Sequence, residues 1–445
     1  MRLKRIAAPI AALTLITSTA VMVPMSSGAA AYTAINGGEF SFEKYLVMKN
    51  EANVPNVDFG LTVEPIADSE VIDATTSTLA VMKGPSGIKF KSGVADVTPK
   101  AATATEPASA TVSFKSSDTT ISEENKGSKS LSFKTTDTTD EKFAEKIIKL
   151  DLSEAMFQEP GIYRYKITET ASTGVAGVTN DTNNIRYLDV YVKNESAGTD
   201  AEETTTAKLA VQGYYLHTDA AAPVKGTADS SKKSTGFSNN YTTNDLEFRK
   251  VVTGNQGSKD KYFKINVKLS NPDNLAISDS DIFNITGNWD KIPEKNSATK
   301  YDTVLMEQAN NVSSVTYADL KGEGYSFYIH DGQLIELHGI PSGLGYEITE
   351  TEEDYSPSVV MNDNGDIKTG DKSDEGTDID TSKKNSVSDS FLKSDAGIIF
   401  TNDRAGNIPT GILSTVAGSA GIVAIGLAGI LGGAFYLKKK KSEEE

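Results

Sequence analysis

The chain has 445 residues, a formal net charge of −17 at pH 7 and no cysteine. The excess of acidic residues argues against nucleic acid as a partner. The three histidines, His217, His330 and His338, lack metal-ligand spacing and lie near no nucleophile motif, so no metal site, cofactor or hydrolase triad is expected. These features argue against an enzyme that turns over a substrate.

Residues 1–31 have the pattern of a cleaved secretory signal peptide. Residues 1–5 are basic, residues 6–23 are mostly apolar, and the small residues Ala29 and Ala31 suit signal peptidase. The mature chain is expected to begin near Tyr32. An exported chain without cysteine has no disulfide to brace it, which makes another covalent constraint attractive.

The central part of the chain has a β-strand pattern. Short alternating runs rich in Val, Ile, Thr, Phe and Tyr begin at residue 40 and are separated by clusters of Gly, Asn, Asp and Ser. The length exceeds that of one ordinary sandwich. The sequence therefore predicts an all-β protein with two tandem β-sandwich domains.

An internal repeat divides this central part into two halves. Each half has an opening strand, a late strand and a closing strand, and the matching segments are 40–46 with 246–252, 165–170 with 346–351, and 237–239 with 400–402. We therefore predict an N-terminal domain over residues 32–241 and a C-terminal domain over residues 242–406. The linker is short, which favours a rod over a flexible string.

The opening strands each place a lysine among apolar residues. Because side chains alternate between the two faces of a strand, Lys44 shares a face with Phe42 and Leu46, and Lys250 shares one with Phe248. A lysine is rarely buried without a partner. The repeat of this anomaly favours a common role for both lysines.

The late and closing strands supply a glutamate and an asparagine in the same way. Glu169 and Glu350 alternate onto the apolar faces of the late strands, and Asn239 and Asn402 share a face with the phenylalanines of the closing strands. In the first domain, Asn240 is a less favoured partner for Lys44 than Asn239, because the strand alternation turns Asn240 outward. Each predicted core thus contains one lysine, one glutamate and one asparagine.

Two ordinary explanations compete with a chemical one. The residues could be solvated strand ends, or each lysine could form a buried ion pair with its glutamate beside a hydrogen-bonded asparagine. The duplicated coincidence of three residues argues against both. The chemical hypothesis is an autocatalytic isopeptide bond, in which a neutral lysine amine attacks the asparagine amide while a protonated carboxyl polarises that amide, shuttles protons and lets ammonia leave.

With these residues, the chain resembles the major pilins of Gram-positive bacteria that carry streptococcal-type isopeptide-linkage domains. The resemblance rests on residues 40–55, 163–170, 237–254, 346–351 and 400–402. It implies immunoglobulin-like sandwiches, a Lys44–Asn239 bond with Glu169 as catalytic acid, and a Lys250–Asn402 bond with Glu350. Cross-links between the first and last strands would prevent each sandwich from unzipping under tension.

The C-terminal tail resembles a sortase sorting signal. The motif Ile408-Pro409-Thr410-Gly411, within residues 407–411, precedes an apolar transmembrane segment at 412–437 and a charged cytoplasmic tail at 438–445. Proline extends the backbone and glycine leaves the threonine carbonyl open to a cysteine transpeptidase. The motif departs from Leu-Pro-x-Thr-Gly, so the sequence leaves the sortase class open.

These features together predict a backbone pilin subunit on the surface of a Gram-positive bacterium. The expected partners are a pilus-type or housekeeping sortase, identical subunits in a covalent polymer, minor pilins and peptidoglycan. Lys193 is the candidate lysine that accepts the next subunit, a role that the resemblance implies. The alternative is a monomeric cell-wall-anchored adhesin, or a minor pilin, that binds a host or community ligand.

Overall fold

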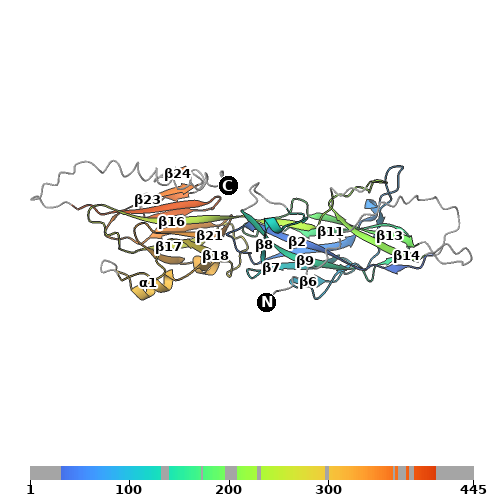
Figure 1. The fold of residues 1–445 in the computed structure, drawn as a ribbon, viewed down its shortest axis with the longest axis horizontal. Helices are drawn as coiled ribbons and strands as arrows, with labels where there is room; N and C mark the ends of the chain where they lie inside the picture. Colours follow the sequence, from blue (N-terminus) through green and yellow to red (C-terminus); the bar gives the residue numbers. More distant parts are fainter. Residues whose placement is uncertain are drawn as a thin grey trace, which may run out of the picture. The chain divides into compact units, whose positions relative to one another are not determined.

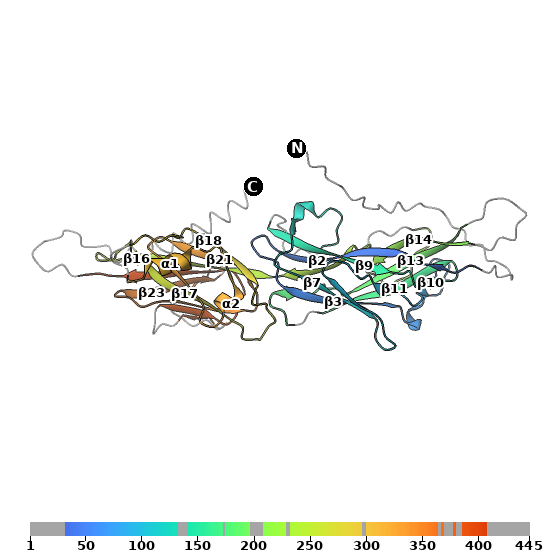
Figure 2. The same cartoon turned by 90° about the horizontal axis from the view of Figure 1, so that it is seen from below.

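The computed structural model describes residues 32–131, 140–171, 174–195, 208–227, 232–295, 300–363, 366–368, 377–379 and 385–406. The predicted signal peptide, sortase motif and C-terminal segment lie outside these residues. β-Strands dominate the described part (Figure 1), which includes two short helices, α1 (Thr303–Asn310) and α2 (Tyr317–Leu320), both labelled in Figure 2. The prediction of an all-β protein is confirmed. None of the helices in these ranges is long and apolar enough to cross a membrane.

The chain forms two compact units. The described residues up to Thr242, with Ala276–Asp281, make the first unit, and Thr243–Leu275 with the described residues from Ile282 onward make the second. The first closing strand ends at Tyr241 and the next strand begins at Thr243. One short segment of the second half of the sequence therefore packs with the first unit.

The first unit contains two main sheets. One has the strand order β14-β13-β11-β3-β7-β6, with β4 also paired to β11, and the other has the order β12-β15-β2-β9-β5, with β8 paired to β9. A separate pair joins β1 (Ile35–Asn36) to β10 (Met156–Phe157). The bounds of the first sheet are β14 (Lys208–His217), β13 (Ile185–Glu195), β11 (Gly161–Thr170), β3 (Val57–Pro65), β7 (Ala108–Phe114), β6 (Val97–Lys100) and β4 (Met82–Lys83). Those of the second are β12 (Val178–Thr179), β15 (Gly236–Tyr241), β2 (Glu39–Lys49), β9 (Glu141–Asp151), β5 (Lys89–Phe90) and β8 (Thr120–Ser122).

The two sheets of the first unit share one core. Figure 2 shows β2 and β9 on one side and β7, β3 and β11 on the other. Buried residues of both sheets join a single cluster, including Phe42 and Ile148 from one sheet and Phe59 and Ile167 from the other. Burying each such side chain contributes roughly 1.5–3 kcal/mol, which makes the alternating apolar pattern the main force that pairs the sheets.

The second unit also contains two sheets. One has the order β19-β18-β21-β16-β27-β23-β24 and the other has the order β20-β17-β22-β26-β25. The bounds of the first are β19 (Ser314–Thr316), β18 (Ile282–Gly287), β21 (Leu334–Pro341), β16 (Thr243–Thr253), β27 (Ala396–Asp403), β23 (Ser356–Asp363) and β24 (Asp366–Lys368). Those of the second are β20 (Tyr325–Ile329), β17 (Phe263–Ser270), β22 (Gly345–Glu350), β26 (Ser386–Asp389) and β25 (Thr377–Ile379).

The opening and closing strands of each unit are parallel neighbours. β2 pairs with β15 so that Lys44 lies opposite Phe237, and β16 pairs with β27 so that Lys250 lies opposite Phe400. In both units the asparagine follows that phenylalanine by two residues, on the same face of its strand. The same register therefore brings lysine and asparagine together twice.

Candidate cross-linking sites

In the first unit, Lys44, Glu169 and Asn239 meet in the core between the two sheets. Lys44 and Asn239 come from neighbouring strands of one sheet, and Glu169 comes from β11 of the other. The lysine Nζ lies 3.1 Å from both carboxylate oxygens, and Asn239 Nδ2 donates to Glu169 Oε1 at 2.5 Å. Lys44 and Asn239 are 0% exposed, so water cannot compete for these contacts.

The second unit repeats this arrangement with Lys250, Glu350 and Asn402. Lys250 Nζ lies 2.6 Å from Glu350 Oε2, and Asn402 Nδ2 donates to Glu350 Oε1. Lys250 and Asn402 again share one sheet, while Glu350 belongs to the opposing sheet. All three residues are buried. The structure thus brings together both sets of residues that the sequence singled out and leaves none of them as a solvated strand end.

An aromatic ring covers each lysine amine, a feature that the sequence analysis missed. Lys44 Nζ lies 4.4 Å from the centroid of Phe59, and Lys250 Nζ lies 4.3 Å from that of Phe263. Both rings lie on the strand next to the glutamate strand: Glu169 pairs with Leu61 and Glu350 with Ile265, each two residues beyond the phenylalanine. Each set thus repeats a fourth residue, a phenylalanine whose ring covers the lysine amine and keeps water from it.

Burial changes the acid–base balance at both sites. Desolvation lowers the pKa of Lys44 to about 8 and that of Lys250 to about 8, although the neighbouring glutamate opposes the effect. Burial also raises the pKa of Glu350 above its ordinary value. These shifts bring the charged pair closer in free energy to a neutral amine beside a neutral acid, which is the state that a nucleophilic lysine requires.

The side-chain amides of Asn239 and Asn402 are not oriented as expected. A carboxyl that polarises an amide should contact the amide oxygen. At both sites the amide nitrogen, not the amide oxygen, faces the glutamate. A single carboxyl group therefore contacts the amine that would attack and the nitrogen that would leave. This geometry suits proton transfer between the two nitrogens.

A second asparagine in each unit was also missed by the sequence analysis. The backbone N–H of Glu169 donates to the carbonyl of Asn184 at 2.8 Å, and the Asn184 side chain donates back to the Glu169 carbonyl at 3.3 Å. Glu350 and Asn385 make the same two hydrogen bonds, both at 2.8 Å. These pairs fix the backbone of each glutamate. In both units this asparagine directly precedes the strand that pairs with the late strand, β13 or β26, which is the available sequence signal.

The remaining predicted residues lie elsewhere. Asn240 is partly exposed and follows the buried Asn239, as the strand alternation requires. Lys193 is exposed near the end of β13, opposite Ala210 of β14. The sortase residues Ile408, Pro409, Thr410 and Gly411 lie outside the described residues, so their assignment stays a prediction from sequence.

One group of potential metal ligands occurs within the described ranges. Ligand atoms of Asp245, Glu336 and His338 lie within 4.8 Å of one another. His338 Nδ1 is 3.2 Å from Asp245 Oδ2, and Nε2 is 2.7 Å from the hydroxyl of Thr286. Both ring nitrogens thus have polar neighbours, which favours a hydrogen-bonded histidine, and we propose no metal there.

Comparisons with known proteins identify relatives of this chain. Residues 244–382 match the model of a family described as a domain of unknown function, DUF7601. A curated protein named Pilin, from Streptococcus pyogenes serotype M1, is 26% identical over 417 residues, which cover 92% of this chain and 93% of that protein. The predicted resemblance to pilins is confirmed by this homologue.

Solved structures of streptococcal pilins also match. The major pilin from Streptococcus pyogenes is 21% identical, with 84% of this chain and 100% of that chain covered and a TM-score of 0.44. The major pilin protein T-13 from Streptococcus pyogenes serotype GAS131465 is 20% identical, with 83% of this chain and 98% of that chain covered and a TM-score of 0.41.

Proposed function

We propose that this chain is a structural backbone subunit of a Gram-positive cell-surface pilus, braced in each unit by an autocatalytic isopeptide bond. Each unit would then be an immunoglobulin-like sandwich with its first and last strands covalently joined. The observation that carries the proposal is the duplicated buried set of lysine, glutamate and asparagine. Homology to a streptococcal protein named Pilin supports it independently.

The cross-linking chemistry follows from the contacts of the glutamate. Proton transfer from Lys44 to Glu169 gives a neutral amine, which attacks the amide carbon of Asn239. Glu169 protonates the departing Nδ2 and takes a proton from the attacking Nζ, so that it ends as a neutral acid holding the proton that Lys44 first gave up. A carbon–nitrogen bond forms to lysine, another breaks, and ammonia leaves. The chain performs this reaction once per site and is therefore not a turnover enzyme.

The position of the bonds suits a subunit that carries load. In the second unit, tension would enter at the start of the opening strand and leave at the end of the closing strand, and these two strands are parallel neighbours. Pulling on opposite ends of parallel strands shears their ladder of hydrogen bonds. A covalent bond between the two strands would carry the force directly and keep the remaining strands out of the load path.

Polymerisation would use the C-terminal motif. A sortase cysteine would attack the carbonyl of Thr410 and release Gly411, and a lysine amine of a neighbouring subunit would resolve the thioester. Lys193 is exposed, as an acceptor must be. Resolution by cell-wall peptide instead would attach the finished pilus to peptidoglycan. Minor pilins are the other proposed partners.

Intact mass and polymer assembly test the two parts of the proposal. Residues 32–410, expressed without sortase, should weigh less than the sequence mass by two ammonia molecules, with peptides that join Lys44 to Asn239 and Lys250 to Asn402. Full-length chain expressed with a pilus-type sortase should give a ladder of covalent multimers. Unmodified mass would overturn the isopeptide assignment. Cell-wall attachment without a ladder would favour a monomeric adhesin.

A further inference from the structure

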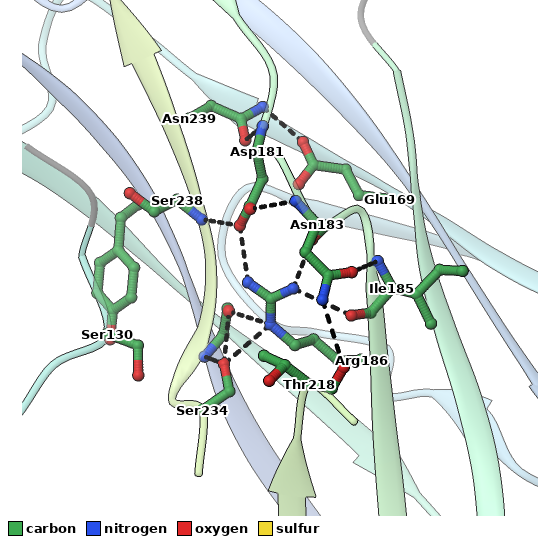
Figure 3. Close-up of polar contacts among 12 residues, drawn as sticks. Ser130, Glu169, Asp181, Asn183, Ile185, Arg186, Thr218, Ser234, Ser238 and Asn239 are labelled. Carbon is green, nitrogen blue, oxygen red and sulfur yellow. Dashed lines mark hydrogen bonds and ion pairs between the residues drawn. The ribbon is translucent and has the colours of Figure 1, made fainter. Parts of the chain in front are cut away.

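Asn239 lies between two groups that fix the orientation of its amide (Figure 3). Its nitrogen donates to Glu169, and its oxygen accepts from the backbone N–H of Asp181 at 3.0 Å. A backbone N–H can only donate, so the atom that faces it must be the amide oxygen. The leaving nitrogen is thereby held on the proton-carrying glutamate.

The loop that supplies this N–H is fastened to the strand that carries Asn239. Asp181 Oδ2 accepts from the backbone N–H of Ser238 at 2.9 Å, and Ser238 directly precedes Asn239. The other carboxylate oxygen accepts from the backbone N–H of Asn183 at 2.9 Å. Asp181 thus contacts two successive residues of β15, one through its carboxylate and one through its own backbone.

Arg186 holds Asp181 in turn. Its Nη2 lies 2.7 Å from Asp181 Oδ2, and the two side chains are only 6% and 7% exposed. Nε donates to Ser234 and to the carbonyl of Gly236, while the guanidinium lies 4.6 Å from the centroid of Phe237. Figure 3 shows this guanidinium beneath Asp181 with its donors directed at groups other than Asn239. The arginine therefore supports the loop and does not contact the reacting amide.

We propose that the backbone N–H of Asp181 is the oxyanion donor for cross-linking in the first unit, and that the Asp181 carboxylate and Arg186 position it. This inference rests on the proposed isopeptide reaction. When Lys44 Nζ adds to the amide carbon, the pair of electrons from the C=O bond moves onto Oδ1, which then bears a negative charge against this N–H. Collapse returns the electrons to the C=O bond as the bond from the amide carbon to Nδ2 breaks and the protonated Nδ2 leaves as ammonia.

The charges around the site are compatible with this role. Asp181 raises the pKa of Lys44 and Arg186 lowers it, so the ion pair places little net charge beside the amine. A preorganised neutral donor in a water-excluded site stabilises developing charge at no cost of reorganisation. The corresponding positions of the second unit fall within residues 380–384, which lie outside the described residues, so the proposal concerns the first unit.

Replacement of the Asp181 backbone amide by an ester tests the donor directly. The full mature chain would be made by cell-free synthesis with the α-hydroxy acid analogue of aspartate at position 181, which removes the N–H and keeps the side chain. Samples quenched over time and digested would give the amount of each cross-linked peptide. The rate at which the Lys250–Asn402 peptide forms serves as an internal reference within the same molecule. We expect formation of the Lys44–Asn239 cross-link to slow by about 10²-fold and to reach the same final yield, while the rate of Lys250–Asn402 formation is unchanged.

A control variant separates this role from general support of the fold. Asp189→Asn disrupts another buried ion pair of the first unit, in which Asp189 lies 2.7 Å from Arg164, without touching Asn239. It should leave the Lys44–Asn239 rate within a few-fold of wild type. An ester variant that reacts at the wild-type rate, or an equal slowing in Asp189→Asn, would overturn the oxyanion assignment alone. A wild-type chain with neither cross-link would overturn the proposed function, and this inference with it.

Discussion

Lys44 Nζ lies 3.1 Å from both carboxylate oxygens of Glu169, although the two residues belong to opposite sheets of the first unit. Lys250 and Glu350 also pair between opposite sheets in the second unit, with Nζ 2.6 Å from Oε2. An ion pair this deeply buried seldom stabilises a protein enough to offset its desolvation. The proposed conversion to a neutral amide bond would remove both the lysine charge and that cost.

Removing one glutamate should abolish one cross-link. Glu169→Ala takes away the proton carrier of the first unit. The variant should therefore be heavier by one ammonia than the mass calculated for it with both cross-links, and peptide mapping should find Lys44 free. The Lys250–Asn402 bond should form normally because its own glutamate is intact. Glu350→Ala should give the reverse pattern.

The matched control is Glu123→Ala, which removes a buried glutamate that pairs with Lys126. Both cross-links should persist in that variant. A Lys44–Asn239 peptide recovered in full from Glu169→Ala would show that the carboxyl is dispensable.

Loss of the first bond should reduce stability markedly. Asn239→Ala leaves the lysine and glutamate in place but removes the amide that would be attacked. On the chain-entropy estimate for a cross-link that closes so long a loop, the free energy of unfolding of the first unit should fall by about 5 kcal/mol. Denaturant unfolding followed by fluorescence, with the second unit as reference, measures the change.

Asn240→Ala is the control for that comparison, because Asn240 is the neighbouring asparagine and faces away from Lys44. It should keep both cross-links and unfold close to wild type. If the two variants unfolded at the same denaturant concentration with the same mass, the assignment of Asn239 would be wrong.

The rate of cross-linking should depend on pH in a bell shape. The reactive pair needs one proton, on glutamate, while the amine is neutral. Because burial lowers the pKa of Lys44 and Lys250 to about 8, the pair loses its last proton above about pH 8 and no acid remains for the leaving nitrogen. At low pH both groups are protonated and the amine cannot attack. For Lys250, the raised pKa of Glu350 moves this acidic limb above the usual range of a glutamate.

Initial rates of freshly synthesised chain between about pH 5 and 10 give this profile, with each cross-linked peptide quantified separately. A rate that climbs steadily through the alkaline range would mean that the amine alone limits the reaction and that the glutamate supplies no proton.

Lys193→Arg should prevent polymer assembly. The substitution keeps the positive charge but replaces the amine by a guanidinium, which is protonated at any working pH and a poor nucleophile. Chain expressed with a pilus-type sortase should then give no ladder of multimers. Lys208→Arg, on the paired strand β14 and highly exposed, is the matched control and should polymerise normally. An intact ladder in Lys193→Arg would move the acceptor to another lysine.

Strand alternation accounts for much of what could be predicted. A side chain on a β-strand points to the same face as its neighbours two residues away, so the apolar company of Lys44 and Lys250 was visible in the sequence. The repeat then linked each lysine to a glutamate and an asparagine. Because these relations are local or duplicated, the sequence indicated both triads before any contact between strands was known.

The order and direction of strands were not visible in this way. The pairing of β2 with β15 and of β16 with β27 as parallel neighbours depends on how distant segments assemble, and no turn between them reports it. The same assembly brings Phe59 and Phe263 over the lysines from the opposing sheets. Each phenylalanine looks like an ordinary core residue in its own strand.

The sequence alone therefore determined which side chains face the core and which chemistry they could perform, because alternation within a strand is a local property of the backbone. Only the tertiary structure decided how the amide of Asn239 is oriented. That orientation depends on the N–H of Asp181, which reaches the amide from a loop 58 residues away in the chain. Such a contact has no sequence signature, since every residue other than proline carries the same backbone donor and only the fold directs it.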